Sequence, residues 1–280
     1  MSEHSEQIPR IGEQPELESM RLEVDGDVGT LTLDRPDELN AMSPTMIGEL
    51  ATVSSWLADR APLRALVITG SGRAFSAGGD VTWFRQGLDD PEADLVASVR
   101  RGADVLHQAI VDFKRIPYPV IAAVNGPAAG AGFSLALMCD IRIASDAAFF
   151  AVAYGRIGAA PDGGMTYFLP RVIGPAAAAE LMLEDPNLTA ADALERGLVS
   201  RVVPADELLA TVGAKATELA AKAPHYVRMV KSLIWESLDN SLADHLQLER
   251  HGIAESMGTE DLRNGVTKFF AGEQPVFEGR

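Results

Sequence analysis

The stretch PVIAAVNGPAAGAGFSLALMCDIRIAS, residues 119–145, decides the fold class of this 280-residue chain. Residues 119–124 form a short apolar run, which is typical of a strand buried on both faces. The residues NGP at 125–127 end that run, and a helix of small residues is expected to begin near Gly130. Residues 140–145 (DIRIAS) predict the next strand. A strand, a helix and a second strand in this order indicate a βαβ crossover, so the sequence predicts an α/β core.

The same alternation continues on both sides of this unit. Residues 20–25 and 28–34 alternate apolar and polar residues around a DGD turn, which predicts a β-hairpin. Ser43 and Pro44 are typical of a helix start, with Ser as the N-cap and Pro at the first helical position. The other expected elements are a helix at 43–59, a buried strand at 64–69, a helix at 91–113, a short strand at 199–203, and helices at 164–183, 189–196, 205–222, 224–238, 241–256 and 260–271.

The chain is expected to have three parts. They are a disordered acidic tail at 1–18, a core at 19–204 and a helical region at 205–280. The last helices carry many apolar residues, from Leu233 to Phe270. This much apolar surface favours contact with another subunit, and the alternative is that it packs against the chain's own core.

Composition excludes several classes of protein. The chain has 24 Lys and Arg against 40 Asp and Glu, a formal net charge of −16, which argues against a protein that binds nucleic acid or an anionic membrane. Cys139 is the only cysteine, so no internal disulfide can form, which fits a reducing compartment. The longest apolar stretch, 128–139, is shorter than the roughly 20 residues of a membrane span. Because no secretory signal pattern is present, we expect a soluble cytoplasmic protein.

Common catalytic motifs are incomplete in this sequence. Neither Gly70-x-Gly72 nor Gly130-x-Gly132 continues to the third glycine of a dinucleotide-binding loop, and there is no GxxxxGK phosphate loop. No cluster of His, Cys, Asp or Glu has the spacing of metal ligands, so no metal is expected. Ser76 in AFSAG is one residue short of a GxSxG nucleophile motif, which leaves a serine hydrolase as an alternative.

Three loops that contain glycine each follow a predicted strand. These loops lie at residues 70–80, 125–132 and 155–164. Glycine allows backbone N–H groups to approach a ligand without a side chain in the way. One N–H group from residues 76–79 and one from residues 130–132, at a helix start, would together stabilise an oxyanion. The alternative is that these glycines only allow tight turns.

Several segments together resemble the crotonase (enoyl-CoA hydratase/isomerase) superfamily. The resemblance implies a spiral of ββα units and C-terminal helices that assemble a homotrimer or a hexamer. It also implies an acyl-CoA substrate, with no cofactor beyond the coenzyme A that belongs to the substrate. The segments are LTLDRPDELNAM (31–42), GSGRAFSAGGDV (70–81), the stretch 119–145, GRIGAAPDGGMTYFLPRVIG (155–174) and NGVTKFFAGEQPVF (264–277).

The resemblance also assigns residues to the site. It places the two oxyanion donors on the backbone N–H groups of Ala77 and Ala131. The residues expected to contact coenzyme A are Arg35, Leu39, Ala41, Ser76, Gly78, Gly79, Asp80 and Gly130, and the candidates for the pocket wall are Trp83, Ser134 and Tyr154.

The catalytic carboxylates depart from the hydratase pattern. Hydratases of the superfamily carry two glutamates, and Ser134 and Tyr154 occupy those positions here. Asp162, in PDGG, matches a carboxylate that transfers protons in the dienoyl-CoA and epoxyphenylacetyl-CoA isomerases of the superfamily. We therefore expect an enoyl-CoA isomerase with Asp162 as the base. The alternatives are an enoyl-CoA hydratase, a non-catalytic acyl-CoA-binding protein and, for Asp162 itself, an N-cap of the following helix.

Overall fold

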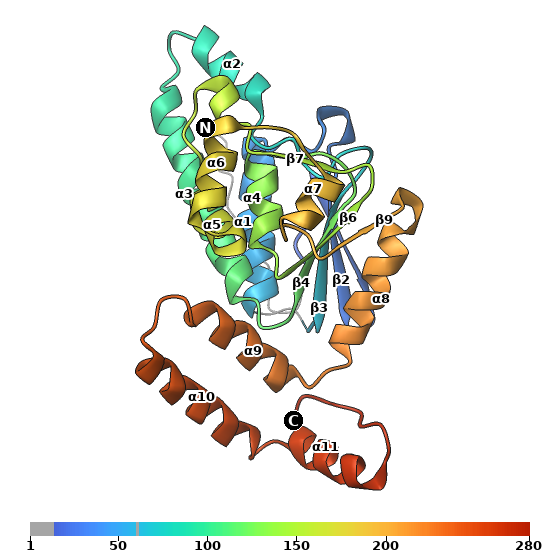
Figure 1. Ribbon diagram of the computed structural model, residues 1–280. Helices are drawn as coiled ribbons and strands as arrows, with labels where there is room; N and C mark the ends of the chain where they lie inside the picture. The colour runs from blue at the N-terminus through green and yellow to red at the C-terminus, as the bar shows by residue number, and fades with distance from the viewer. Residues whose placement is uncertain (1–13, 60–61) are drawn as a thin grey trace.

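A six-stranded sheet forms the centre of the computed structural model, which describes residues 14–59 and 62–280 (Figure 1). Its strand order is β1-β2-β3-β4-β6-β9. The first pair is antiparallel, as the predicted hairpin requires, and every later pair is parallel. The strands are β1 (Met20–Asp25), β2 (Val28–Leu33), β3 (Ala65–Gly70), β4 (Val120–Val124), β6 (Ile141–Ser145) and β9 (Arg201–Val203).

A smaller sheet and a set of helices surround this centre. The smaller sheet has the order β5-β7-β8, with β5 at Ala128–Ala129, β7 at Phe149–Ala151 and β8 at Leu188–Thr189. The α-helices are α1 (Pro44–Asp59), α2 (Val81–Asp89), α3 (Leu95–Arg115), α4 (Ala131–Met138), α5 (Met165–Ile173), α6 (Pro175–Glu184), α7 (Ala190–Glu195), α8 (Leu208–Ala220), α9 (Pro224–Glu236), α10 (Leu242–Ser256) and α11 (Glu260–Ala271).

Alternate residues of the central strands pack into two hydrophobic cores, one on each face of the large sheet. Leu66 and Ile68 of β3 belong to the larger core, which they share with α1, α3 and α4. Ala65 and Val67 of the same strand pack with α8 in the smaller core. Because side chains alternate between the faces of a strand, an unbroken apolar run such as β3 is the pattern expected for a strand covered on both sides.

The helices differ from the sequence predictions in two places. The expected helix at 164–183 is divided into α5 and α6, because Gly174 adopts φ 84° and Pro175 begins the second helix. Helix α2, which buries none of its residues, was not predicted. Its start is fixed by Asp80, whose carboxylate accepts the N–H groups of Thr82 and Trp83.

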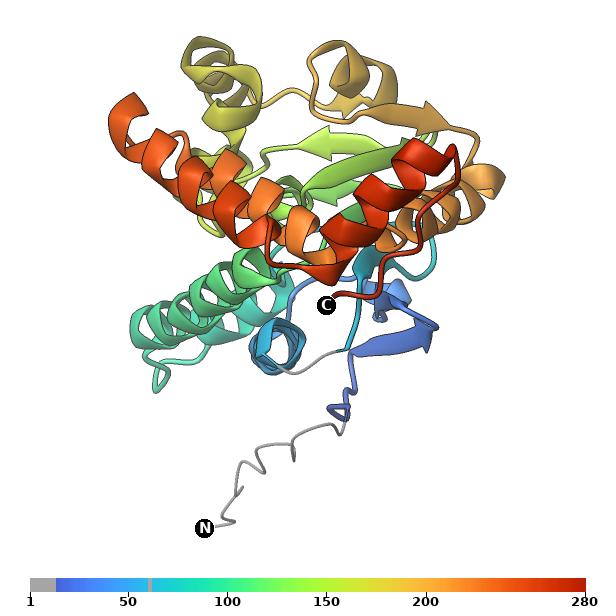
Figure 2. The same cartoon turned by 90° about the horizontal axis from the view of Figure 1, so that it is seen from below.

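The helices α9, α10 and α11 form an arm at the lower end of the core (Figure 1), and Figure 2 shows them spread across it. In these three helices of the described chain only Gly252 and Asp261 are buried. Trp235 of α9 packs on the larger core, but the core of the same chain leaves many of the other apolar side chains of the arm uncovered. The exposed ones include Tyr226, Ile234, Leu238, Leu242, Ile253, Met257, Phe269 and Phe270.

A buried charge cluster joins the arm to the core. Lys231 of α9 lies 2.7 Å from Asp140, which precedes β6, and Lys114 of α3 lies 3.2 Å from the other oxygen of the same carboxylate. The Lys114 ammonium also lies 4.2 Å from the centre of the Trp235 ring of α9. One carboxylate thus holds cations from two helices that are distant in sequence.

The predicted tail at 1–18 falls mainly outside the described residues, which begin at residue 14. Residues 14–18 lie against the fold: Gln14 donates to the Leu22 carbonyl, and Leu17 packs on the larger core. Among the helices of residues 14–59 and 62–280, none has the length and hydropathy needed to cross a membrane.

Candidate active site

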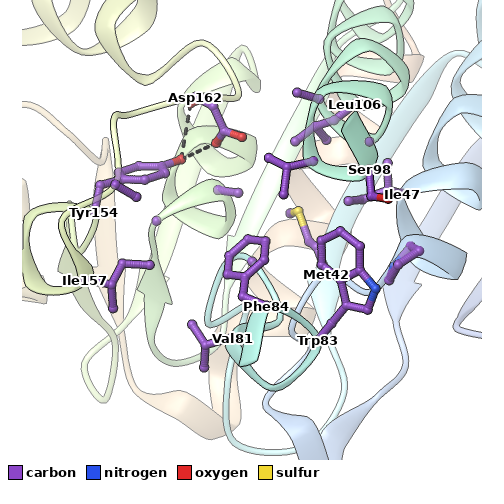
Figure 3. A pocket seen from close by; sticks show the side chains of 18 of the residues that line it. Met42, Ile47, Val81, Trp83, Phe84, Ser98, Leu106, Tyr154, Ile157 and Asp162 are labelled. Carbon is purple, nitrogen blue, oxygen red and sulfur yellow. Dashed lines mark hydrogen bonds between the residues drawn. The ribbon is translucent and has the colours of Figure 1, made fainter. Parts of the chain in front are cut away.

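A cavity of about 720 Å³ lies between helices α2 and α3, the start of α4 and the segment 153–162 (Figure 3). Most of its wall is apolar, with only a few polar groups, as is typical of a site for a small organic ligand. The apolar side chains that line it include Met42, Ile47, Val81, Trp83, Phe84, Leu106 and Ile157.

Two of the predicted glycine loops meet at one side of this cavity. Ser76, in the loop after β3, accepts the Ala129 N–H through its carbonyl at 2.9 Å. Gly132, in the first turn of α4, approaches the same residue so closely that a Cβ atom would lie 2.4 Å from the Ser76 carbonyl oxygen. Only glycine fits there, and the close approach places the start of α4 against the loop.

Among the residues of this junction that line the cavity, Gly79 and Ala131 have backbone N–H groups without an acceptor in the described chain. Ala131 is the first residue of α4, where an N–H has no partner within the helix. The Ala77 N–H, by contrast, donates to the Leu39 carbonyl at 2.9 Å. The donor predicted at Ala77 is therefore already occupied, and the free N–H lies two residues further on, at Gly79.

The segment before α1 braces the same loop. Asn40 is fully buried and donates from its amide to the carbonyls of Ser71 and Ala74. The Ser76 hydroxyl donates to the Asn40 carbonyl at 2.8 Å, and Ser76 is fully buried. Because this hydroxyl is enclosed and engaged, the serine hydrolase alternative is wrong.

Arg35 and Asp80 contact each other at 3.2 Å, and neither lines the cavity. Arg35 also donates to the Ala41 carbonyl, and Asp80 caps α2, so both residues hold the loop in place. Their contact with coenzyme A stays a prediction. The same applies to the other predicted coenzyme A residues that do not line the cavity, Leu39, Ala41, Ser76 and Gly78.

Asp162 lines the cavity and is the only acidic residue among those of the described chain that do so. The Tyr154 hydroxyl donates to Asp162 Oδ1 at 2.8 Å (Figure 3). The alternative role of Asp162, as the N-cap of the next helix, is wrong. Helix α5 begins at Met165 after Gly164, which has φ 82°, and no side chain caps it.

The turn before Tyr154 is held in an unusual conformation. Ala153 has φ 64°, a left-handed conformation that is uncommon outside glycine. Its N–H donates to Asp185 Oδ1 at 2.8 Å, and Arg156 lies 3.2 Å from Asp185 Oδ2. Asp185 thus fixes the turn on both sides of Tyr154, whose ring lies along the cavity wall.

Ser134 lies next to Tyr154 and Asp162, although it does not itself line the cavity. Its fully buried hydroxyl is 3.3 Å from the Tyr154 hydroxyl and donates to the Asp162 carbonyl at 3.1 Å. Burial raises the pKa of Tyr154, and the negative charge of Asp162 raises that pKa further. Tyr154 therefore keeps its proton and acts as a hydrogen-bond donor to the carboxylate.

The structure brings together Ala77, Gly79, Gly130, Ala131, Trp83, Tyr154 and Asp162 around the cavity, all predicted as site residues. Sequence reasoning missed the wall formed by α3, which contributes Arg101, Val105 and Leu106. The amphipathic pattern of that helix shows which face is apolar but not which part of the face meets a ligand. In the part of the chain that the structure describes, no group of three or more potential ligands could hold a metal ion.

Comparison with known proteins agrees with this arrangement. The chain matches the enoyl-CoA hydratase/isomerase family over residues 23–280. A 1,2-epoxyphenylacetyl-CoA isomerase of Escherichia coli is 37% identical over 264 residues, which cover 94% of this chain and 100% of that protein. A probable enoyl-CoA hydratase of Mycobacterium bovis is 36% identical over 263 residues, which cover 94% of this chain and 99% of that protein. The chain also matches the crystal structure of an enoyl-CoA hydratase from Bacillus anthracis, with a TM-score of 0.87 and 29% sequence identity. This match covers 94% of this chain and 100% of the Bacillus anthracis chain. The chain therefore belongs to the enoyl-CoA hydratase/isomerase family and has the crotonase fold.

Proposed function

We propose that this protein is an enoyl-CoA isomerase in which Asp162 transfers the proton. The observation that carries the proposal is that Asp162 is the only acidic residue lining the cavity in the described chain. Hydration by a pair of carboxylates would need a second carboxylate in the cavity. The two positions that hold glutamates in hydratases are Ser134 and Tyr154 in this chain. Both of those hydroxyls instead contact Asp162.

One carboxylate is sufficient for moving the double bond of a 3-enoyl thioester. Asp162 removes a proton from Cα, and the C–H electron pair moves into the thioester to form an enolate. The protonated carboxyl then returns that proton to Cγ, the carbonyl is restored and the double bond comes to lie between Cα and Cβ. Atoms and charges balance without a cofactor, because coenzyme A enters only as part of the substrate.

A direct assay tests the proposal. The purified protein is given a 3-enoyl-CoA and, separately, a 2-enoyl-CoA, and the products are separated by chromatography. We expect the first to be converted to its 2-enoyl isomer and the second to remain unhydrated. Formation of 3-hydroxyacyl-CoA would favour the hydratase alternative, and binding without any conversion would favour a non-catalytic acyl-CoA-binding protein.

The free N–H groups of Gly79 and Ala131 supply the proposed oxyanion hole. Ala131→Pro removes one donor, at the first position of a helix, where proline is generally tolerated. We expect kcat on 3-enoyl-CoA to fall by about 10²–10³-fold, the usual loss for one oxyanion donor. The measurement is steady-state kinetics, with circular dichroism to verify folding.

Glu260→Pro is the matched control for this substitution. It places proline at the first position of α11, outside the cavity, after Thr259 in an extended conformation that suits a following proline. We expect this variant to keep the wild-type kcat. If folded Ala131→Pro is as active as the control, the Ala131 N–H is not an oxyanion donor.

The exposed apolar arm supports a proposal that the protein is a homo-oligomer built through α9–α11. The chain mass of 29.8 kDa gives 3 × 29.8 = 89.4 kDa for a trimer. We expect sedimentation equilibrium to give this mass or twice it. Replacing Phe269 and Phe270, exposed at 79% and 84%, with Asp should shift the population toward the monomer. A wild-type mass of one chain would contradict the proposal.

A further inference from the structure

The two oxygens of the Asp162 carboxylate are in different situations. Oδ1 accepts the Tyr154 hydroxyl at 2.8 Å, whereas Oδ2 has no hydrogen-bond partner among the described residues. Tyr154 has one proton, and the Asp162 carbonyl lies further from its hydroxyl, at 3.2 Å, so the carboxylate is the better-placed acceptor. The side chain is therefore held by one oxygen only, with the other left unengaged beside the cavity that Asp162 lines (Figure 3).

Ser134 completes a ring of contacts around this pair. Its hydroxyl lies 3.3 Å from the Tyr154 hydroxyl, 3.1 Å from the Asp162 carbonyl and 3.4 Å from the Gly130 carbonyl. The ring fixes Tyr154 relative to the main chain of Asp162 as well as to its carboxylate. It also ties both groups to the start of α4, where the proposed oxyanion donor Ala131 lies.

From this geometry we infer that Tyr154 is a positioning residue that selects Oδ2 of Asp162 as the atom that carries the proton. The inference rests on the proposed function, in which Asp162 is the base. Transfer from Cα to Cγ requires one oxygen to serve two carbons in turn, and a carboxylate free to rotate would lose that alignment. With Oδ1 engaged by Tyr154, the C–H proton goes to Oδ2 and leaves from Oδ2.

The test is Tyr154→Phe, which removes the hydroxyl and keeps the ring volume. We expect kcat on 3-enoyl-CoA to fall by about 10–100-fold, while KM changes by less than about threefold because no substrate contact is lost. We also expect label from D₂O to enter Cγ more often, because the proton escapes from an unaligned carboxyl. Ser134→Ala leaves the Tyr154–Oδ1 contact in place, and its effect on kcat should be much smaller.

Tyr226→Phe is the control, because this tyrosine is 56% exposed on α9 and does not line the cavity. It should keep the wild-type kcat and the wild-type deuterium content at Cγ. If Tyr154→Phe also keeps both, the inference is overturned while the role of Asp162 stands. If the wild type does not isomerise 3-enoyl-CoA, or if Asp162→Asn is fully active, it is the proposed function that fails.

Discussion

Asp162→Asn is expected to lose isomerase activity by about 10³–10⁴-fold, in the upper range of losses when a general base is removed. The amide is nearly isosteric, and its oxygen can still accept the Tyr154 hydroxyl that lies 2.8 Å from Oδ1. The fold and the cavity should therefore be preserved, and only the ability to take a proton is lost. Steady-state kinetics with 3-enoyl-CoA measures the loss, and titration with a saturated acyl-CoA should show a Kd within about threefold of wild type.

Asp104→Asn is the control for this substitution. Asp104 is exposed on α3, the helix that forms one wall of the cavity, and does not itself line it. The control should match the wild type in both measurements. Isomerase activity of Asp162→Asn within tenfold of the control would show that another group carries the proton.

Asp140→Ala is expected to lower the free energy of unfolding by about 3–5 kcal/mol, the usual cost of removing one partner from a buried charge cluster. The substitution leaves Lys114 and Lys231, exposed at 14% and 12%, without their shared carboxylate. It also removes the acceptor of the Val120 N–H at the start of β4. Urea denaturation measures the loss.

Asp89→Ala provides the comparison for a charge pair on the surface. Asp89 pairs with Arg85 at 3.4 Å, and both side chains are well exposed, at 70% and 82%. Exposed ion pairs contribute about 0–1 kcal/mol to stability. The free energy of unfolding of this variant should therefore be close to that of the wild type. Equal stability of the two variants at neutral pH would contradict the stabilising role of the Asp140 cluster.

The contribution of Asp140 to the free energy of unfolding should persist to low pH. Burial opposes its charge, but Lys231 and Lys114 outweigh that effect and hold the pKa of Asp140 below its usual value. A group with a lowered pKa in the folded state stabilises the protein fully above its unfolded pKa of about 3.9 and loses that effect as the pH falls through the folded value. The stability difference between wild type and Asp140→Ala should therefore be constant near neutral pH and close only in strongly acidic solution.

Much of the core follows from the sequence because its central strands β3 and β4 are buried on both faces. The strands predicted at 64–69, 119–124 and 140–145 correspond to β3, β4 and β6 within one residue at each end. The two- and three-residue strands of the smaller sheet were not predicted, because so short an element has no detectable period. Helix α2 was missed for a different reason: its apolar side chains Val81, Trp83 and Phe84 line the cavity, and none of them is buried in the core.

The loops that form the site could be predicted from the sequence, but several contacts between their residues could not. Asp162 and Ala131 both line the cavity, as the resemblance to the crotonase superfamily implied. The resemblance placed an oxyanion donor on Ala77, but a sequence does not show that the Ala77 N–H donates to the Leu39 carbonyl. Nor does it show that Ser134 reaches the Asp162 carbonyl across 28 residues of chain, since only the folded backbone brings these groups within 3.1 Å.

In the proposed reaction, one carboxylate moves a proton between two carbons of an enoyl thioester. Mass and NMR analysis of the product that the wild-type protein forms from 3-enoyl-CoA in D₂O tests this transfer. We predict 2-enoyl-CoA with less than one deuterium per molecule at Cγ, because Asp162 returns much of the proton that it removes from Cα. A 3-hydroxyacyl-CoA product, or recovery of 3-enoyl-CoA with neither isomerisation nor exchange at Cα, would contradict it.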